Sequence, residues 1–192
     1  MSSFEFILIS IAIVVGFGIS EVLAGWGQQL RLRRELHAYP LQIVASVYLL
    51  SLSLRFVWNL WALQGVVWTF LGYLLVFLPA LVLALSAHLL RVDVLSLRRT
   101  PRAQYFAVQR PLFGLLALFP IFAGAGTFYG RVHLQPTFGD NVLLLGLLPF
   151  AVCSFAWMML SENPRHHWIA WTVVWAVHIA ISLMVLPTLA TP

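Results

Sequence analysis

The chain of 192 residues is 61% hydrophobic and only 9% charged, with a mean hydropathy of +0.93. A soluble domain of this length needs far more polar surface around its core, so the composition excludes a soluble globular protein and predicts a membrane protein. All of the 11 basic residues are arginines. Their positions beside apolar segments favour contact with a membrane and argue against nucleic-acid binding.

Six apolar segments are long enough to cross a bilayer, which takes roughly 20 residues per helix. They cover residues 4–26, 41–63, 66–90, 112–129, 142–160 and 168–186. Because these segments fill the chain, we expect one transmembrane domain over residues 1–192, an all-α polytopic bundle of six transmembrane helices. The first segment has neither the basic start nor the cleavage site of a signal peptide, so we expect it to remain in the protein. A tight turn is expected at Gln64 and Gly65.

Arginine is distributed unevenly among the connections between these segments, which predicts the orientation of the chain. The connections after the first, third and fifth segments contain Arg31, Arg33, Arg34, Arg91, Arg98, Arg99, Arg102, Arg110 and Arg165, and those on the other side contain only Arg131. The arginine-rich side is predicted to face the cytoplasm, so both termini are expected on the outer side.

The longest connection, residues 91–111, is predicted to be a basic cytoplasmic loop that contains a short helix. Thr100 is suited to cap that helix and Pro101 to its first position. Two interpretations remain open: a loop anchored to lipid phosphates, or a docking site for a cytosolic protein partner. The candidate interaction residues are Arg98, Arg99, Arg102, Tyr105 and Arg110; the Tyr105 ring is expected in the headgroup region.

Three ionisable residues lie inside the apolar segments, where charge is costly and generally faces the bundle interior. The helical rise puts Glu21 and His178 roughly 15 Å, and Arg55 roughly 21 Å, from the basic side, so the three could share one layer. Gly18 and Gly25 flank Glu21 on the same helical face, which predicts that this face is pressed against a neighbouring helix.

The second segment carries a polar stripe on one helical face, because its members are spaced three and four residues apart. The stripe consists of Tyr48, Ser51, Arg55 and Asn59. The expected partner of Arg55 is Glu21, with His178 as a second candidate. This polar centre has two interpretations, a structural ion pair that fixes helix packing and a functional site for an ion, a proton or a ligand.

The sequence predicts no metal site and no cofactor. The stretch "SENPRHHW" is explained by the start of a helix, with Asn163 as its cap and Pro164 in its first position. A bis-histidine haem needs two histidines at similar depth, whereas His88 and His178 differ by roughly 10 Å. Cys153 is the single cysteine, which excludes a dithiol oxidoreductase.

Two stretches, "GFGISEVLAGW" and "AQYFAVQRPLF", resemble recurring marks of an uncharacterised family of small bacterial multi-pass inner-membrane proteins. The resemblance covers the chain from its first through its fourth segment. It implies a bacterial inner-membrane location and draws attention to Glu21, Tyr105 and Arg110. It implies no activity and assigns none of these residues a role.

The leading hypothesis is a channel or transporter for a small solute or ion, with Glu21, Arg55, Asn59 and His178 at its polar centre. The alternative is a membrane-embedded sensor or assembly protein that acts through the arginine-rich loop. An enzyme ranks third, because no nucleophile–base or metal constellation is recognisable. The expected partners are the lipid bilayer and, as hypotheses, a second copy of the chain or a cytosolic protein, but no nucleic acid.

Overall fold

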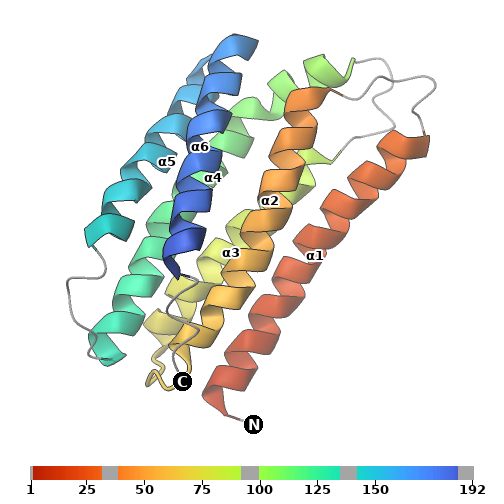
Figure 1. Cartoon of the computed structure of the whole chain (residues 1–192). Coiled ribbons are helices and arrows are strands. Elements are labelled where there is room, and N and C mark those ends of the chain that lie inside the picture. Colours follow the sequence, from red (N-terminus) through yellow and green to blue (C-terminus); the bar gives the residue numbers. More distant parts are fainter. Residues whose placement is uncertain (1, 32–38, 92–99, 135–141, 186–192) are drawn as a thin grey trace.

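The structure is a computed structural model that describes residues 2–31, 39–91, 100–134 and 142–185 (Figure 1). These residues form six α-helices and one short 3₁₀ helix, and they contain no strand. The helices are α1 (Ser3–Arg31), α2 (Pro40–Asn59), the 3₁₀ helix η1 (Leu60–Leu63), α3 (Phe70–Leu90), α4 (Pro101–Leu134), α5 (Val142–Leu160) and α6 (Pro164–Val185).

A helix occupies each of the six apolar segments. Four helical stretches are long and apolar enough to cross a membrane: Ser3–Arg31, Pro40–Leu63, Phe70–Leu90 and Pro101–Gly130. A shorter apolar helix covers Gly146–Leu160. The chain therefore has the helices of an integral membrane protein, whereas six membrane spans with both termini outside stay a prediction.

Two helices are longer than their apolar segments. α1 continues to Arg31, five residues beyond the expected end, and α4 already begins at Pro101. The short helix expected in the basic loop is thus the first part of α4 and is continuous with the rest, although Pro111 lies inside it. The Thr100 side chain accepts a hydrogen bond from the backbone N–H of Ala103 at 3.3 Å, which confirms it as a cap.

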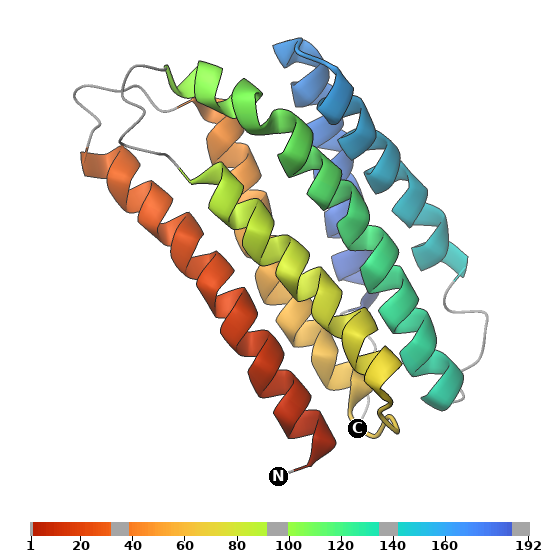
Figure 2. The ribbon, with the colours of Figure 1, turned by 180° about the vertical axis from the view of Figure 1, so that it is seen from behind.

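The helices pack as a closed bundle. α3 lies between α1 and α4, and α5 packs between α4 and α6 (Figure 2). α2 contacts α1 and α3 and completes the bundle through a smaller contact with α6 (Figure 1). We call this contact the α2–α6 seam, because it joins the first three helices of the chain to the last one.

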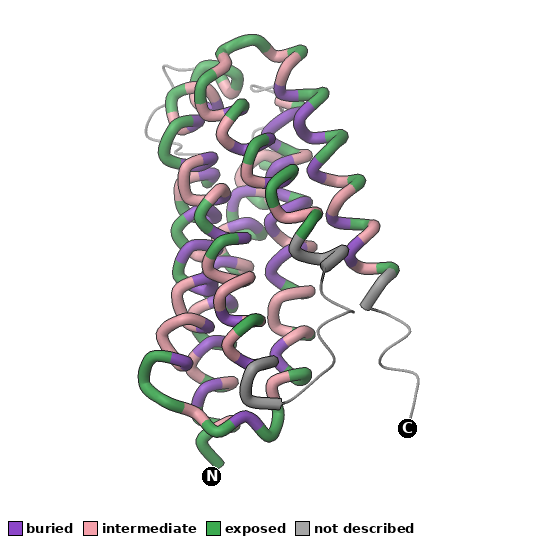
Figure 3. Tube along the Cα trace, turned by 90° about the vertical axis from the view of Figure 1, so that its left-hand side faces the viewer, coloured by how far each residue is buried: buried purple, intermediate pink, exposed green. Residues whose placement is uncertain are grey.

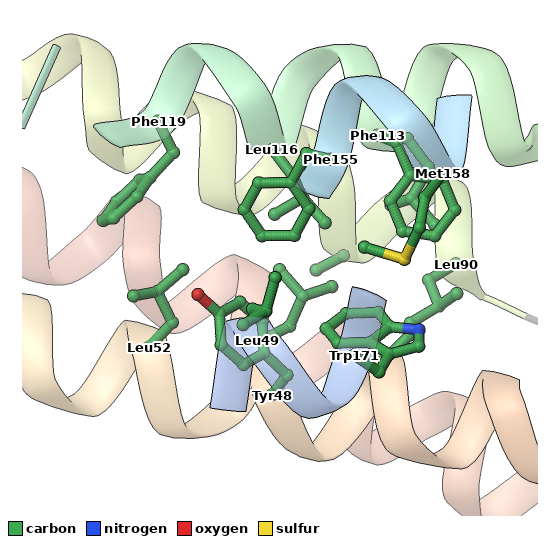
Figure 4. Close-up of a cluster of buried hydrophobic side chains, with 14 of the residues drawn as sticks. Tyr48, Leu49, Leu52, Leu90, Phe113, Leu116, Phe119, Phe155, Met158 and Trp171 are labelled. Carbon is green, nitrogen blue, oxygen red and sulfur yellow. The ribbon is translucent and has the colours of Figure 1, made fainter. Parts of the chain in front are cut away.

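Apolar side chains fill the centre of the bundle. Buried positions alternate with exposed ones along each helix (Figure 3), as expected for helices with one face against neighbours and the other against lipid. Leu49, Leu116, Phe113 and Phe155 are among the side chains that meet at the centre, each at most 1% exposed (Figure 4). The axis is consequently packed with hydrocarbon and aromatic rings.

Gly65 and Gly18 illustrate two reasons for glycine in the bundle. Gly65 turns the chain between η1 and α3 with φ of 94°, a conformation that favours glycine. Gly18 lies so close to α3 that a Cβ atom would be 3.0 Å from the Ala84 Cα. This close approach confirms that the glycine-bearing face of α1 is pressed against a neighbouring helix.

One end of the bundle collects the basic residues. Here α1 and α3 end and α2, α4 and α6 begin; we call it the basic end. Contacts across it include a hydrogen bond of 3.2 Å from Gln104 Nε2 to the Arg91 carbonyl and an edge-on ring contact of 5.4 Å between Tyr39 and Tyr105. The arginines described there are Arg31, Arg91, Arg102, Arg110 and Arg165.

Candidate functional site

Polar side chains from α2 and α6 meet across the seam. The Arg55 Nη1 donates to the His178 carbonyl at 3.1 Å and to the Ser182 hydroxyl at 3.4 Å. The Ser51 hydroxyl lies 2.8 Å from His178 Nε2. The Ser182 hydroxyl donates to the His178 carbonyl at 2.8 Å, so that carbonyl accepts hydrogen bonds from two side chains. We call these four residues the seam site.

Helical spacing explains why these groups meet. Ser51 and Arg55 are four residues apart on α2, as are His178 and Ser182 on α6, so each pair shares a helical face. The Tyr48 ring, one turn below Ser51, contacts the His178 ring at a centroid distance of 5.4 Å. Tyr48, Ser51 and Arg55 of the predicted stripe therefore face α6, with Arg55 beside His178. Glu21, which was predicted for the same layer, is not part of it.

Aromatic rings form the apolar side of the seam site. Tyr48 also contacts Trp171 and Trp175 at 5.2 and 5.5 Å, and Trp175 contacts the His178 ring at 5.6 Å. Asn59, the last residue of the predicted stripe, ends α2 one turn beyond Arg55. No hydrogen bond joins its side chain to the seam site within the described part of the chain.

Arg55 has no acidic partner among the described residues. The ion pairs described there both involve Glu21, which contacts Arg91 at 3.0 Å and His88 at 3.5 Å. The prediction of a Glu21–Arg55 pair is therefore wrong. The guanidinium of Arg55 is half-buried, and its hydrogen-bond partners are neutral oxygens.

The position of α1 explains where Glu21 lies. A Cβ atom on Gly25 would be 4.0 Å from the Arg91 Cα, so the end of α3 lies level with Gly25. Glu21 is one turn, about 6 Å, inside that level, and α1 continues past it to Arg31. Arg31 therefore does not mark the boundary of the bundle, and Glu21 sits near the basic end and not in the layer of Arg55.

A second polar cluster, buried at the basic end, was not predicted from the sequence. The His167 Nε2 donates to the Ser161 carbonyl at 2.7 Å, which leaves Nδ1 to accept from the Tyr105 hydroxyl at 3.0 Å. The Trp171 Nε1 donates to the Tyr105 oxygen at 3.3 Å. Tyr105 and His167 are at most 1% exposed. Helix periodicity shows that each residue is on an inner face, but it does not show which helices become neighbours.

Charge within this cluster is disfavoured. Burial lowers the pKa of the His167 imidazole, the hydrogen bond to the Ser161 carbonyl opposes that shift, and the neighbouring His166 adds to it. A neutral imidazole matches the hydrogen-bond pattern, in which one ring nitrogen donates and the other accepts. The cluster thus joins α4, α6 and the end of α5 as a satisfied network of neutral groups.

The residues predicted for the cytoplasmic interaction loop lie in different surroundings from those expected. Tyr105 is buried against His167, so its ring contacts protein and is not exposed to lipid headgroups as expected. Arg102 and Arg110 are exposed on the first turns of α4. Arg98 and Arg99 lie outside the described residues.

No metal-binding group was found in the described residues: no three or more histidine, cysteine, aspartate or glutamate side chains gather there. Asn163 accepts a hydrogen bond from the backbone N–H of Arg165 at 3.0 Å, and α6 begins at Pro164. This confirms that "SENPRHHW" starts a helix.

Surface hollows are present away from the seam site. One lies between α4 and α5 and is lined by Pro120, Gly124, Phe128, Pro149 and Cys153 among others. Another lies at the end opposite the basic end, between the starts of α1 and α3. Neither includes a residue of the seam site.

The fold defines the class of the protein: it is a helical protein in which four helical stretches are long and apolar enough to cross a membrane, as in integral membrane proteins. Comparison with known proteins adds no family to it, since no family model, curated protein or solved structure matches the chain. The resemblance drawn from "GFGISEVLAGW" and "AQYFAVQRPLF" therefore stays a prediction.

Proposed function

We propose that this integral membrane protein transfers a small ionic or polar solute across the bilayer, and that the seam site binds the solute. The observation that carries the proposal is the Arg55 guanidinium, a cation inside an apolar helix that has no acidic partner among the described residues. An unpaired charge in such surroundings is costly, and residues of this kind commonly mark solute pathways.

The packing of the bundle supports a route along the seam rather than a pore along the axis. The centre is filled by side chains such as Leu49, Leu116 and Phe155 (Figure 4). The α2–α6 contact is smaller than the contacts of α3 with α1 and α4. Polar groups bridge it at the level of Arg55, and these groups can exchange their hydrogen bonds for contacts with a solute.

The experiment is a flux assay on the full chain in proteoliposomes, with chloride, nitrate, inorganic phosphate and acetate as separate probes. We expect passage of at least one probe, and we expect Arg55→Gln to reduce that passage at least about tenfold, because a charge-assisted contact is lost. Arg165→Gln is the matched control, since Arg165 is exposed at the basic end. It should leave passage unchanged.

Two results would contradict the proposal. One is the absence of flux above empty liposomes for every probe, with the protein folded and correctly inserted. The other is equal flux for Arg55→Gln and the unmodified chain. The variant Glu21→Gln distinguishes the seam site from the polar centre around Glu21 that the sequence predicted. We expect flux through Glu21→Gln to equal that of the unmodified chain, whereas a solute site at Glu21 would lower it.

A further inference from the structure

The hydrogen bonds of Arg55 leave much of its guanidinium unused. A guanidinium carries five N–H donors in a planar fork. In the described part of the chain, Nη1 makes both of the hydrogen bonds of this side chain, and both acceptors are neutral oxygens. The remaining donors and the positive charge have no partner there.

A neighbouring group in the seam site also lacks a partner. His178 is 6% exposed, and its Nδ1 atom is buried without a hydrogen bond. When the ring proton is on Nδ1, the Nε2 atom accepts from the Ser51 hydroxyl and Nδ1 remains a free donor. The seam site thus contains unused N–H donors on Arg55 and a buried ring nitrogen on His178 that has no partner.

We infer that the seam site binds an oxyanion, the phosphate or carboxylate group of a ligand, through the guanidinium of Arg55. The planar fork of arginine matches such groups with two parallel hydrogen bonds and also neutralises their charge. The hydroxyls of Ser51 and Ser182 can turn to donate to the same group. This inference names the ligand class of the solute site proposed above and rests on that function.

The depth of Arg55 allows two sources of this oxyanion. Arg55 lies four residues, about 6 Å, before the end of α2 at Asn59. Trp58 and Trp61 are exposed just beyond it, at 62% and 53%, as is typical of aromatic residues at a membrane surface. An arginine side chain at this depth can reach the level of lipid phosphates, so both a lipid headgroup and a dissolved anion can approach it.

The test is the thermal stability of the full chain in a neutral detergent. One arm compares sodium phosphate with sodium chloride at equal ionic strength, and the other compares micelles containing phosphatidylglycerol with micelles containing neutral diacylglycerol. We expect stabilisation in at least one arm, which identifies the source of the oxyanion. Stabilisation by neither, relative to its control, would overturn the inference.

Variants show whether Arg55 is responsible. We expect apparent affinity at least about tenfold weaker for Arg55→Gln, which removes the charge, and an intermediate loss for Arg55→Lys, which keeps the charge without the fork. Arg165→Gln should respond as the unmodified chain does. Equal responses from Arg55→Gln and the unmodified chain would refute the inference.

An acid of the chain itself is the competing occupant. Asp140 lies outside the described residues, in the connection between α4 and α5. If only Asp140→Asn responds to phosphate or phosphatidylglycerol, a carboxylate of the chain fills the site and the inference is wrong. If Asp140→Asn and the unmodified chain respond alike, the inference stands.

The stability assay tests the inferred ligand class, and the flux assay tests the proposed transport function, so the two can be refuted independently. If the chain is stabilised through Arg55 but passes no anion in proteoliposomes, the inferred oxyanion site stands and the proposed transport function is refuted. If flux depends on Arg55 but neither phosphate nor phosphatidylglycerol stabilises the chain, the proposed transport function stands and the inferred ligand class is refuted.

Discussion

Replacing Tyr105 by phenylalanine should destabilise the fold, although it removes a single oxygen atom. That oxygen accepts from Trp171 Nε1 at 3.3 Å, and its proton is donated to His167 Nδ1 at 3.0 Å. Tyr105 is 1% exposed, so water cannot readily replace the lost partner. Leaving a buried donor or acceptor unsatisfied costs about 1–3 kcal/mol, and we expect a loss of about 2 kcal/mol in the free energy of unfolding.

Tyr39→Phe provides a control with the same chemical change. The Tyr39 ring packs edge-on against Tyr105 at 5.4 Å, and its hydroxyl makes no hydrogen bond within the described residues. We expect this variant to stay within about 0.5 kcal/mol of the unmodified chain, as is usual for surface substitutions. Both variants should be compared by reversible unfolding in mixed micelles. Equal stability of the two variants would refute the idea that the buried cluster stabilises the fold.

Further predictions concern the α1–α3 contact and the basic end. Glu21→Gln should lower unfolding free energy by at most about 1 kcal/mol in the same assay, because its ion pairs are partly exposed. Gly18→Ala should cost about 1–3 kcal/mol through overpacking against the Ala84 backbone, whereas Gly16→Ala meets open space and should not destabilise. Because the pKa of His167 is lowered in the fold, the unfolded chain binds more protons there in acid. Stability should therefore fall as the pH drops below about 6.5, by at most about 1.4 kcal/mol per pH unit, and His167→Gln should reduce this slope.

Hydropathy predicted where the helices lie, because burial in lipid or in a packed core requires apolar residues along a whole helix. It failed at the ends of α1 and α4, where polar residues continue a helix beyond its apolar part. The first part of α4 carries Arg102, Gln104 and Arg110, and was therefore expected as a separate short helix within a loop. It is inclined to the rest of the helix (Figure 2). Pro111, which removes one backbone hydrogen bond, accounts for a bend without ending the helix.

The seam site could be predicted in part. Periodicity indicates which residues share a helical face, and the rise per residue gives their depth. Those two quantities placed Ser51 and Arg55 on one face and made His178 the second candidate partner of Arg55, after Glu21. They do not specify which helices are neighbours around the bundle, and this is why Tyr105 and His167 were missed.

The observed position of Glu21 changes which residue balances the charge of Arg55. Pairing Glu21 with Arg55 would have made the polar centre neutral and explained both residues by structure alone. Glu21 instead contacts Arg91 at the end of α3, where the cost of its charge is offset at a partly exposed site. Arg55 then remains without a carboxylate among the described residues, next to His178, whose Nδ1 atom has no hydrogen-bond partner. The charge that needs explanation is therefore positive, and that sign is why an anionic ligand fits the seam better than the proton or cation path that a buried glutamate would favour.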